Sequence, residues 1–313
     1  MDLRMFNDFS VTEAIGGNHY HLDTDDGVAD CVNFIFNRGF IINLLEYDTS
    51  SFINQNLIGE MNYLMINVDF FGREVLEIDG SIYPRRPGTV TIDHPLGSRI
   101  TYHIPTRRYT GISIGYDLNG FRLIGCDDLP PTAEVIESIM VRYTVDSRLN
   151  FELGPRSEAD LYALRMIMKD PKTMDEDLVH AIVSDLLRNM YLVDKADPVE
   201  IQGSPNRVID DDLWERLMLD GMDSSSIQDI CGELGVDKYS ISRSFSKLYG
   251  HTPYAFHKRH RMMCAAAMII LGERRMNEVS AMAGYSNESK FAGSFKSLFG
   301  CRPKHFRILD GLY

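Results

Sequence analysis

The sequence contains few cysteines, and they lie far apart. Its five cysteines stand at positions 31, 126, 231, 264 and 301, and no two of them form a C-x-x-C pair. This scatter argues against a disulfide framework and against a cysteine-based structural zinc site. It favours a reducing, cytoplasmic location.

Long apolar runs are missing as well. No run approaches the roughly 18 consecutive apolar residues of a membrane-spanning helix, and the apolar stretch from Met262 to Leu271 is too short. The opening residues, MDLRMFNDF, lack the apolar core of a secretory signal. We therefore expect neither a membrane partner nor a leader peptide.

Sequence motifs of the common enzyme classes are also absent. No G-x-S-x-G, P-loop or G-x-G-x-x-G pattern occurs in a supporting context, so a nucleophilic hydrolase, a nucleotide enzyme and a dinucleotide enzyme are not indicated. We expect the protein not to be an enzyme, with no catalytic residues and no cofactor.

Two histidines form the strongest candidate for a metal pair. His19 and His21 have the H-x-H spacing that places two imidazoles on one face of a strand, and His94 or His103 could complete such a site. No carboxylate follows the pair at a familiar spacing, and short motifs match by chance often. The prediction is therefore that no metal is bound.

The charge is divided unevenly along the chain. The whole sequence has a net charge of -13, yet residues 238–313 hold 13 Lys and Arg against 4 Asp and Glu, a balance of +9. The other residues hold 19 basic and 41 acidic side chains, a balance of -22. A basic segment attached to an acidic body indicates a C-terminal part that faces nucleic acid.

The N-terminal part is rich in short β-type segments, and the rest of the chain is helical. Residues 1–130 contain runs of Val, Ile, Phe, Tyr and Thr punctuated by turn residues, and Asp79-Gly80 predicts a hairpin. Without intervening helices, a barrel or sandwich is favoured over a parallel sheet. Helical periodicity predicts three helices between 131 and 195, and 196–206 has the composition of a linker.

The helical region contains an internal repeat. Six positions recur at a spacing of 50, as Phe245, Leu248, Gly250, Pro253 and Phe256 with an aromatic at 249, and again as Phe295, Leu298, Gly300, Pro303 and Phe306 with an aromatic at 299. Such an echo indicates a duplicated supersecondary unit.

Each copy predicts a helix-turn-helix. A short amphipathic helix ends at Gly235 in the first copy and at Gly284 in the second. Asp237 or Ser286 then caps a second helix with polar and basic residues on one face. Between the copies, residues Pro253 to Leu271 predict one helix of about 28 Å, close to the roughly 34 Å between successive major-groove faces.

At this point the chain resembles a known family. Residues 224–307 are similar to the C-terminal DNA-binding region of AraC/XylS-type transcription regulators, on the pattern Val279-x-x-x-Ala283-Gly284-Tyr285-Ser286-x-x-Ser289-x-Phe291-x-x-x-Phe295-Lys296-x-x-Phe299-Gly300-x-x-Pro303-x-x-Phe306-Arg307. A shorter stretch from Leu76, LEIDGSIYPRRPGTVTID, is similar to the cupin-like effector domain that often precedes this region.

The resemblance implies particular DNA contacts. It places base-edge contacts on Tyr239, Ser242 and Arg243, and on Asn287, Glu288 and Lys290 of the second copy. Arg243 alternatively contacts a phosphate, Tyr239 alternatively packs on the helix surface, and Glu288 alternatively stays solvated. The full predicted interface is Lys238, Tyr239, Ser240, Ser242, Arg243, Lys247, Lys258, Arg259, Ser286, Asn287, Glu288, Ser289, Lys290 and Lys296. Gly293 departs from the family, which often carries a basic residue there.

The predicted fold class is multidomain α+β. We expect a cupin-like effector-binding and dimerisation domain over 1–195, with strands to about 130 and helices over 131–195. A linker over 196–206 leads to a double helix-turn-helix domain over 207–313, with units at about 224–250 and 276–300. The helix over 175–194 carries an apolar stripe of Leu178, Ile182, Leu186 and Met190, which packs on the β-domain or pairs with its twin.

The predicted function is a cytoplasmic, effector-responsive transcription regulator, with activation as the family expectation. Its partners would be double-stranded DNA, a small-molecule effector, a second copy of the chain and, for an activator, RNA polymerase. Two alternatives stay open: a metal-dependent cupin enzyme with an auxiliary helical module, and a regulator controlled by a protein partner.

Overall fold

The computed structural model describes most of the chain in two compact units. The described residues are 9–37, 39–55, 63–78, 80–93, 99–117, 132–144, 150–171, 174–192, 194, 198–199, 213, 227–233, 235–272 and 274–306. One unit comprises Met1–Leu123, Leu129–Glu152 and Ala196–Ile201, and the other comprises Ile124–Asp128, Leu153–Lys195 and Gln202–Tyr313. Each unit is described by itself.

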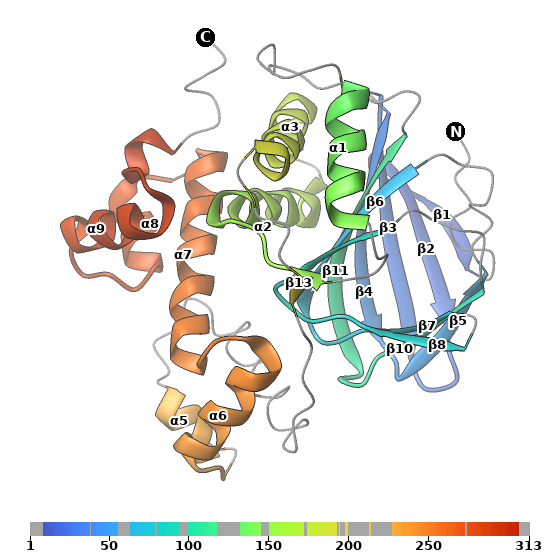
Figure 1. The fold of residues 1–313 in the computed structure, drawn as a ribbon, viewed down its shortest axis with the longest axis horizontal. Coiled ribbons are helices and arrows are strands. Elements are labelled where there is room, and N and C mark those ends of the chain that lie inside the picture. Colours follow the sequence, from blue (N-terminus) through green and yellow to red (C-terminus); the bar gives the residue numbers. More distant parts are fainter. Residues whose placement is uncertain are drawn as a thin grey trace. The chain divides into compact units, whose positions relative to one another are not determined.

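In its described residues, the first unit is built from antiparallel strands and one helix (Figure 1). Its elements are β1 (Ser10–Ala14), β2 (Gly17–Asp23), β3 (Val28–Phe36), β4 (Phe40–Asp48), β5 (Ser51–Gln55), β6 (Tyr63–Phe71), β7 (Val75–Ile78), β8 (Ser81–Pro84), β9 (Val90–Asp93), β10 (Arg99–His103), β11 (Arg108–Asp117), α1 (Thr132–Thr144), β12 (Asn150–Phe151) and β13 (Pro198–Val199).

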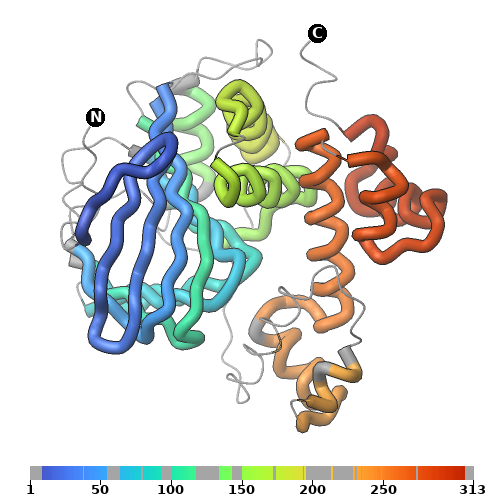
Figure 2. The backbone as a smooth tube through the Cα atoms, turned by 180° about the vertical axis from the view of Figure 1, so that it is seen from behind, coloured from blue at the N-terminus to red at the C-terminus, as the bar shows by residue number. Residues whose placement is uncertain are grey.

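The strands form two sheets in the described residues. The larger sheet has the order β1-β2-β3-β4-β11-β6-β9-β12-β13, and the smaller has the order β5-β10-β7-β8. The predicted hairpin is present, with Ile78 of β7 opposite Ser81 of β8. Figure 2 shows β1 to β4 as a continuous meander along one edge of the larger sheet.

Apolar residues of both sheets pack into one core. Tyr20, Cys31 and Tyr47 of the larger sheet cluster with Phe52 of the smaller one, and the Tyr47 and Phe52 rings lie 4.9 Å apart, edge to face. β4 is buried at six consecutive residues from Phe40 to Leu45, as expected for a strand covered on both faces. The predicted β-rich sandwich or barrel is confirmed as two antiparallel sheets.

The second unit is helical. Its described elements are α2 (Pro155–Lys169), α3 (Glu176–Leu192), α5 (Ile227–Glu233), α6 (Lys238–Tyr249), α7 (Pro253–Leu271), α8 (Met276–Met282), α9 (Glu288–Phe299) and a short 3-10 turn, Pro303–His305. No helix in the described ranges is both long enough and apolar enough to cross a membrane.

The division of the chain differs from the predicted domain boundary at residue 195. α2 and α3 belong to the same unit as the C-terminal helices, because α2 packs on α7. The Tyr162 hydroxyl of α2 lies 2.9 Å from His260 Nδ1 of α7, and Arg156 donates to the Phe306 carbonyl at 2.8 Å. Of the helices predicted for the effector domain, α1 thus lies in the first unit, and α2 and α3 lie with the C-terminal helices.

The apolar stripe of α3 is largely buried. Ile182, Leu186 and Met190 are fully buried and Leu178 is half-buried. α3 also packs on α2 of the same unit. Burial of the predicted stripe within the chain leaves little of it exposed for a twin helix. Part of the predicted linker is β13, which pairs with β12, and residues 200–206 lie outside the described ranges.

Candidate nucleic-acid interface

The first helix-turn-helix unit consists of α5 and α6. As predicted, the Asp237 carboxylate caps α6 by accepting a hydrogen bond from the Ser240 amide at 2.8 Å, and this bond holds the pKa of Asp237 below its ordinary value. Cys231 of α5 is buried, which lets the two helices approach closely.

The second helix-turn-helix unit, α8 and α9, has the same order of helix, glycine turn and helix, but a different residue caps its second helix. The prediction that Ser286 caps the second helix is wrong: Asn287 does so, accepting from the amides of Ser289 at 2.8 Å and Lys290 at 3.2 Å. Asn287 Oδ1 is therefore occupied by the backbone, and its amide NH2 group is what remains to face a ligand. Ser280, the counterpart of Cys231, is likewise buried.

A glycine makes the turn in each unit. Gly235 has a φ of 65° and Gly284 a φ of 82°, in the left-handed region that side chains with a Cβ disfavour. At Gly284 a second constraint applies, because a Cβ there would lie 1.9 Å from a terminal nitrogen of Arg261. The guanidinium of Arg261, on α7, thus lies against the turn of the second helix-turn-helix unit.

Ring packing explains most of the sequence repeat. Phe245 lies 6.0 Å from Phe256 in the first copy, and Phe295 lies 4.9 Å from Phe306 in the second. Phe245 and Phe295 are fully buried. Gly250 and Gly300, each with a φ of 77°, end α6 and α9. The repeated positions therefore maintain the scaffold, and the predicted contact residues lie between them.

The predicted contact residues of α6 lie on its open face. Tyr239 is 84% exposed, an unusual exposure for an aromatic ring. Lys238, Ser240, Arg243 and Lys247 are exposed too, whereas Ser242 is half-buried. The open face of α6 thus presents an aromatic ring and three cationic side chains to solvent.

The predicted contact residues of α9 are likewise exposed. They are Ser286, Asn287, Glu288, Ser289, Lys290 and Lys296. Gly293 is itself exposed, and a Cβ at that position would meet no atom within 4 Å. α9 therefore has room for a side chain at this position.

The connector helix α7 runs as predicted from Pro253 to Leu271, between the α5–α6 pair and the α8–α9 pair (Figure 1). The Thr252 hydroxyl caps its start by accepting from the Ala255 amide at 3.2 Å. Lys258 is exposed and lines a groove of about 380 Å³ together with Ser294 and Ser297 of α9. This position suits a backbone phosphate.

Arg259, the other predicted phosphate contact on α7, is engaged within the protein. Its Nε donates to Glu158 Oε2 of α2 at 2.8 Å, and its Nη2 binds the same carboxylate. The two side chains are 28% and 20% exposed. Arg259 can reach a phosphate only by leaving Glu158 or by sharing its charge with both partners.

Sequence reasoning missed two residues of this region. Glu158 acts through a contact between helices far apart in the chain, which periodicity does not reveal. Arg261 belongs to the basic cluster 257–261 that we expected to suit phosphates, and its contact with the turn at Gly284 was not expected. Tyr254, 70% exposed in the first turn of α7, stands one helical turn before Lys258 and could have been found from that spacing.

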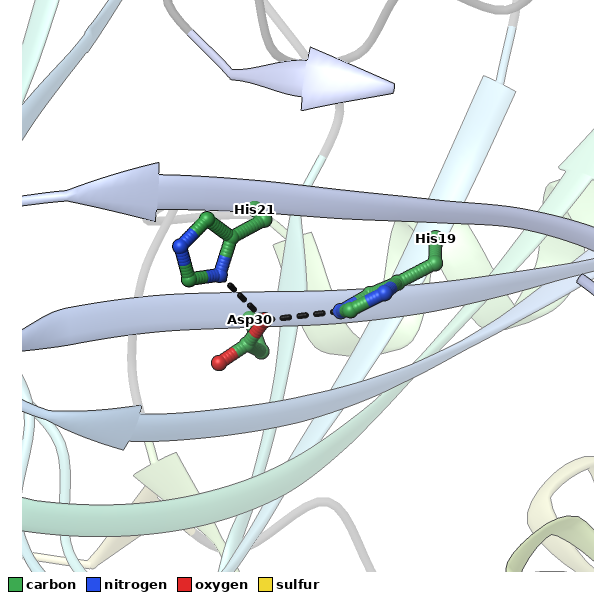
Figure 3. A group of neighbouring side chains, drawn as sticks. All are labelled: His19, His21 and Asp30. Carbon is green, nitrogen blue, oxygen red and sulfur yellow. Dashed lines mark hydrogen bonds and ion pairs between the residues drawn. The ribbon is translucent and has the colours of Figure 1, made fainter. Parts of the chain in front are cut away.

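The H-x-H pair lies beside a carboxylate that the sequence spacing did not indicate. His19 and His21 do meet a carboxylate, Asp30, which comes from the neighbouring strand rather than from a familiar spacing in sequence (Figure 3). His103 does not join them, because it pairs with Glu77 of the smaller sheet at 3.0 Å, and His94 lies outside the described residues.

Comparison with known proteins identifies the helical region. Residues 230–308 match the family model of a helix-turn-helix domain. Over 86 residues the chain is 30% identical to the putative HTH-type transcriptional regulator YkgA of Escherichia coli K12, covering 27% of this chain and 36% of YkgA.

Over 76 residues the chain is 28% identical to the virulence regulon transcriptional activator VirF of Yersinia enterocolitica, covering 24% of this chain and 28% of VirF. The chain thus spans about a third of the length of these curated relatives. Among solved structures, ToxT of Vibrio cholerae aligns with 86% of this chain and 97% of its own, at 14% identity and a TM-score of 0.30.

The matched residues contain α6, α7, α8 and α9 and all fourteen predicted contact residues. Together with the paired helix, glycine turn and helix units, this match identifies residues 230–308 as a helix-turn-helix domain.

Proposed function

We propose that this protein is a sequence-specific DNA-binding transcription regulator. The observation that carries the proposal is the open face of α6, where Lys238, Arg243 and Lys247 stand beside the exposed Tyr239 and no acidic residue interrupts them. A helix with this face, held behind a tight glycine turn, has the form of a recognition helix in the major groove.

The residues divide by role. Arg243 can donate two parallel hydrogen bonds to a guanine edge, the commonest specific contact between a side chain and a base. Lys258 of α7 lies between the two units and suits a phosphate, which fixes register without reading sequence. The cap of α9, Asn287, keeps its amide NH2 group for a base acceptor.

The test is selection of binding sites from random duplexes by the full-length protein. The expected result is an enriched sequence with two blocks about one helical turn apart. The K238A/R243A/K247A variant should lose the enrichment. Arg142→Ala, which removes one exposed cation from α1 of the β-unit, should keep it. Equal enrichment with all three proteins, or none with the wild type at low salt, contradicts the proposal.

The remaining parts of the function rest on the family resemblance. The β-unit would bind a small-molecule effector, two copies would pair, and as an activator the protein would contact RNA polymerase in the cytoplasm. An effector present at 100 times its dissociation constant stabilises its target by about 2.7 kcal/mol. A thermal-shift screen against metabolites tests the effector, and sedimentation of the full chain tests pairing.

A further inference from the structure

The register of β2 and β3 gathers three metal-binding side chains on one face of the larger sheet. His21 stands directly opposite Asp30, and His19 is opposite Val32, which puts it on the diagonal from Asp30. Residues two apart on a strand share a face, and diagonal neighbours across two strands are within reach of long side chains. The three side chains therefore converge.

The distances confirm that convergence. His19 Nε2 lies 2.7 Å from Asp30 Oδ1, and His21 Nδ1 lies 2.8 Å from the same oxygen (Figure 3). The three atoms all lie within 4.8 Å of one another. Two imidazole nitrogens and a carboxylate oxygen thus point to one place.

The cluster lies on two strands whose alternate side chains are buried in the core, and it is open to solvent on its other side. Tyr20 and Cys31, which alternate with these residues along the two strands, are buried in the core between the sheets. His19, His21 and Asp30 therefore lie on the opposite, outer face, where their side chains are 38%, 37% and 29% exposed. Solvent reaches the cluster, and the strands beneath it hold its spacing.

We propose that His19, His21 and Asp30 bind one divalent transition-metal ion of the zinc type. Zinc takes imidazole and carboxylate ligands at about 2.0–2.2 Å, which puts neighbouring ligand atoms roughly 3.3 Å apart in a tetrahedral site. The present separations of 2.7 and 2.8 Å need to widen by only a fraction of an ångström.

A neighbouring carboxylate supports the orientation of one ligand. Asp23 Oδ1 lies 3.4 Å from His21 Nε2, the ring nitrogen that faces away from Asp30. Histidine ligands commonly donate their second N–H to a carboxylate, which fixes the tautomer that binds metal. Two imidazoles among three ligands select zinc, nickel or cobalt over magnesium and calcium, which prefer oxygen.

The test is calorimetric titration of the tag-free, full-length protein with zinc chloride after removal of metals by chelation. We expect one ion per chain and no binding of magnesium. His19→Gln, His21→Gln and Asp30→Asn should each weaken zinc at least tenfold, about 1.4 kcal/mol. Melting curves without metal check that each variant folds like the wild type.

His103→Gln is the matched control. It removes a half-exposed histidine that also pairs with a carboxylate, Glu77, but on the smaller sheet, and it should leave zinc affinity unchanged. Cobalt(II) bound to the wild-type protein should give visible d–d bands without a sulfur charge-transfer band, because no cysteine is a ligand. No zinc binding, affinity unchanged in the three ligand variants, or a sulfur band each overturns the proposal. None of these outcomes bears on the proposed DNA binding.

Discussion

Compared position by position at a spacing of 50, α6 and α9 keep apolar residues at matching positions and differ on their open faces. Ile241, Phe245 and Tyr249 of α6 correspond to Phe291, Phe295 and Phe299 of α9, apolar in both copies. On the open faces, Lys238 corresponds to Glu288 and Arg243 to Gly293.

This difference separates two demands on a duplicated unit. The scaffold must keep its rings and turn glycines to fold, whereas each recognition face is free to diverge. α6 keeps three cations and no carboxylate, while α9 has two cations and one carboxylate. We infer that the first helix-turn-helix unit, α5 and α6, makes most of the base contacts, and that the second, α8 and α9, binds DNA more weakly.

The largest expected effect comes from exchanging arginine for alanine in the first unit. Arg243→Ala should remove about 1–3 kcal/mol of discrimination at one base position, and Lys290→Ala in the second unit should remove less. Competition binding against duplexes with single base changes measures both. If Lys290→Ala relaxes base preference as much as Arg243→Ala, the two units read DNA equally and the comparison fails.

The turn glycines should differ in their cost to folding. Alanine at Gly235 or Gly284 forces a left-handed backbone, which costs about 1–2 kcal/mol. Gly284→Ala should cost more, because the new Cβ displaces the Arg261 guanidinium. Melting curves of both variants measure the difference, and adding Arg261→Ala should erase it. An equal loss at both glycines would show that the Arg261 contact contributes nothing.

A cation restored to the second recognition helix should strengthen it. Gly293→Arg places a basic side chain in open space and removes a helix-weakening glycine, a gain of about 1 kcal/mol in helix propensity. One added phosphate contact should steepen the dependence of log affinity on log salt by about 0.9.

Gly293→Ala is the control for that experiment, since it improves the helix without adding charge. It should raise the melting temperature and leave the salt slope unchanged. A Gly293→Arg protein with the salt slope of the alanine variant would mean that this face of α9 does not approach the duplex.

The smallest effects should come from α7, which both units share. Lys258→Ala should weaken all duplexes alike and lower the salt slope by about 0.9. Arg259→Ala should change little, because Glu158 already holds its charge. In a Glu158→Ala background the same substitution should lower the slope measurably. An effect of Arg259→Ala that does not depend on Glu158 contradicts this account.

Local signals predicted the elements of the helix-turn-helix region well. The cap at Asp237 and the bounds Pro253 to Leu271 were predicted from short-range signals, and α6 and α7 begin accordingly. The cap at Asn287 was misplaced by one residue, since Ser286 and Asn287 are both good caps and the choice depends on how the turn approaches α9.

Contacts between distant segments escaped prediction. The H-x-H spacing placed His19 and His21 on one face of a strand, as β2 does, but it did not indicate which strand lies beside them. Without that pairing, the register that brings Asp30 to His21 could not be derived. The association of α2 with α7 likewise depends on Tyr162 and His260, 98 residues apart.

The unbroken course of α7 has a consequence for the proposed two-block DNA site. Its nineteen residues have a capped start and no proline beyond the first position, so we expect no kink that would change the spacing of the two helix-turn-helix units. Five base pairs are about half of a helical turn of 10–10.5 base pairs. Inserting them between the two blocks would therefore place one block on the opposite side of the duplex. Promoters bound by this protein would then tolerate base substitutions within a block more readily than insertions between the blocks.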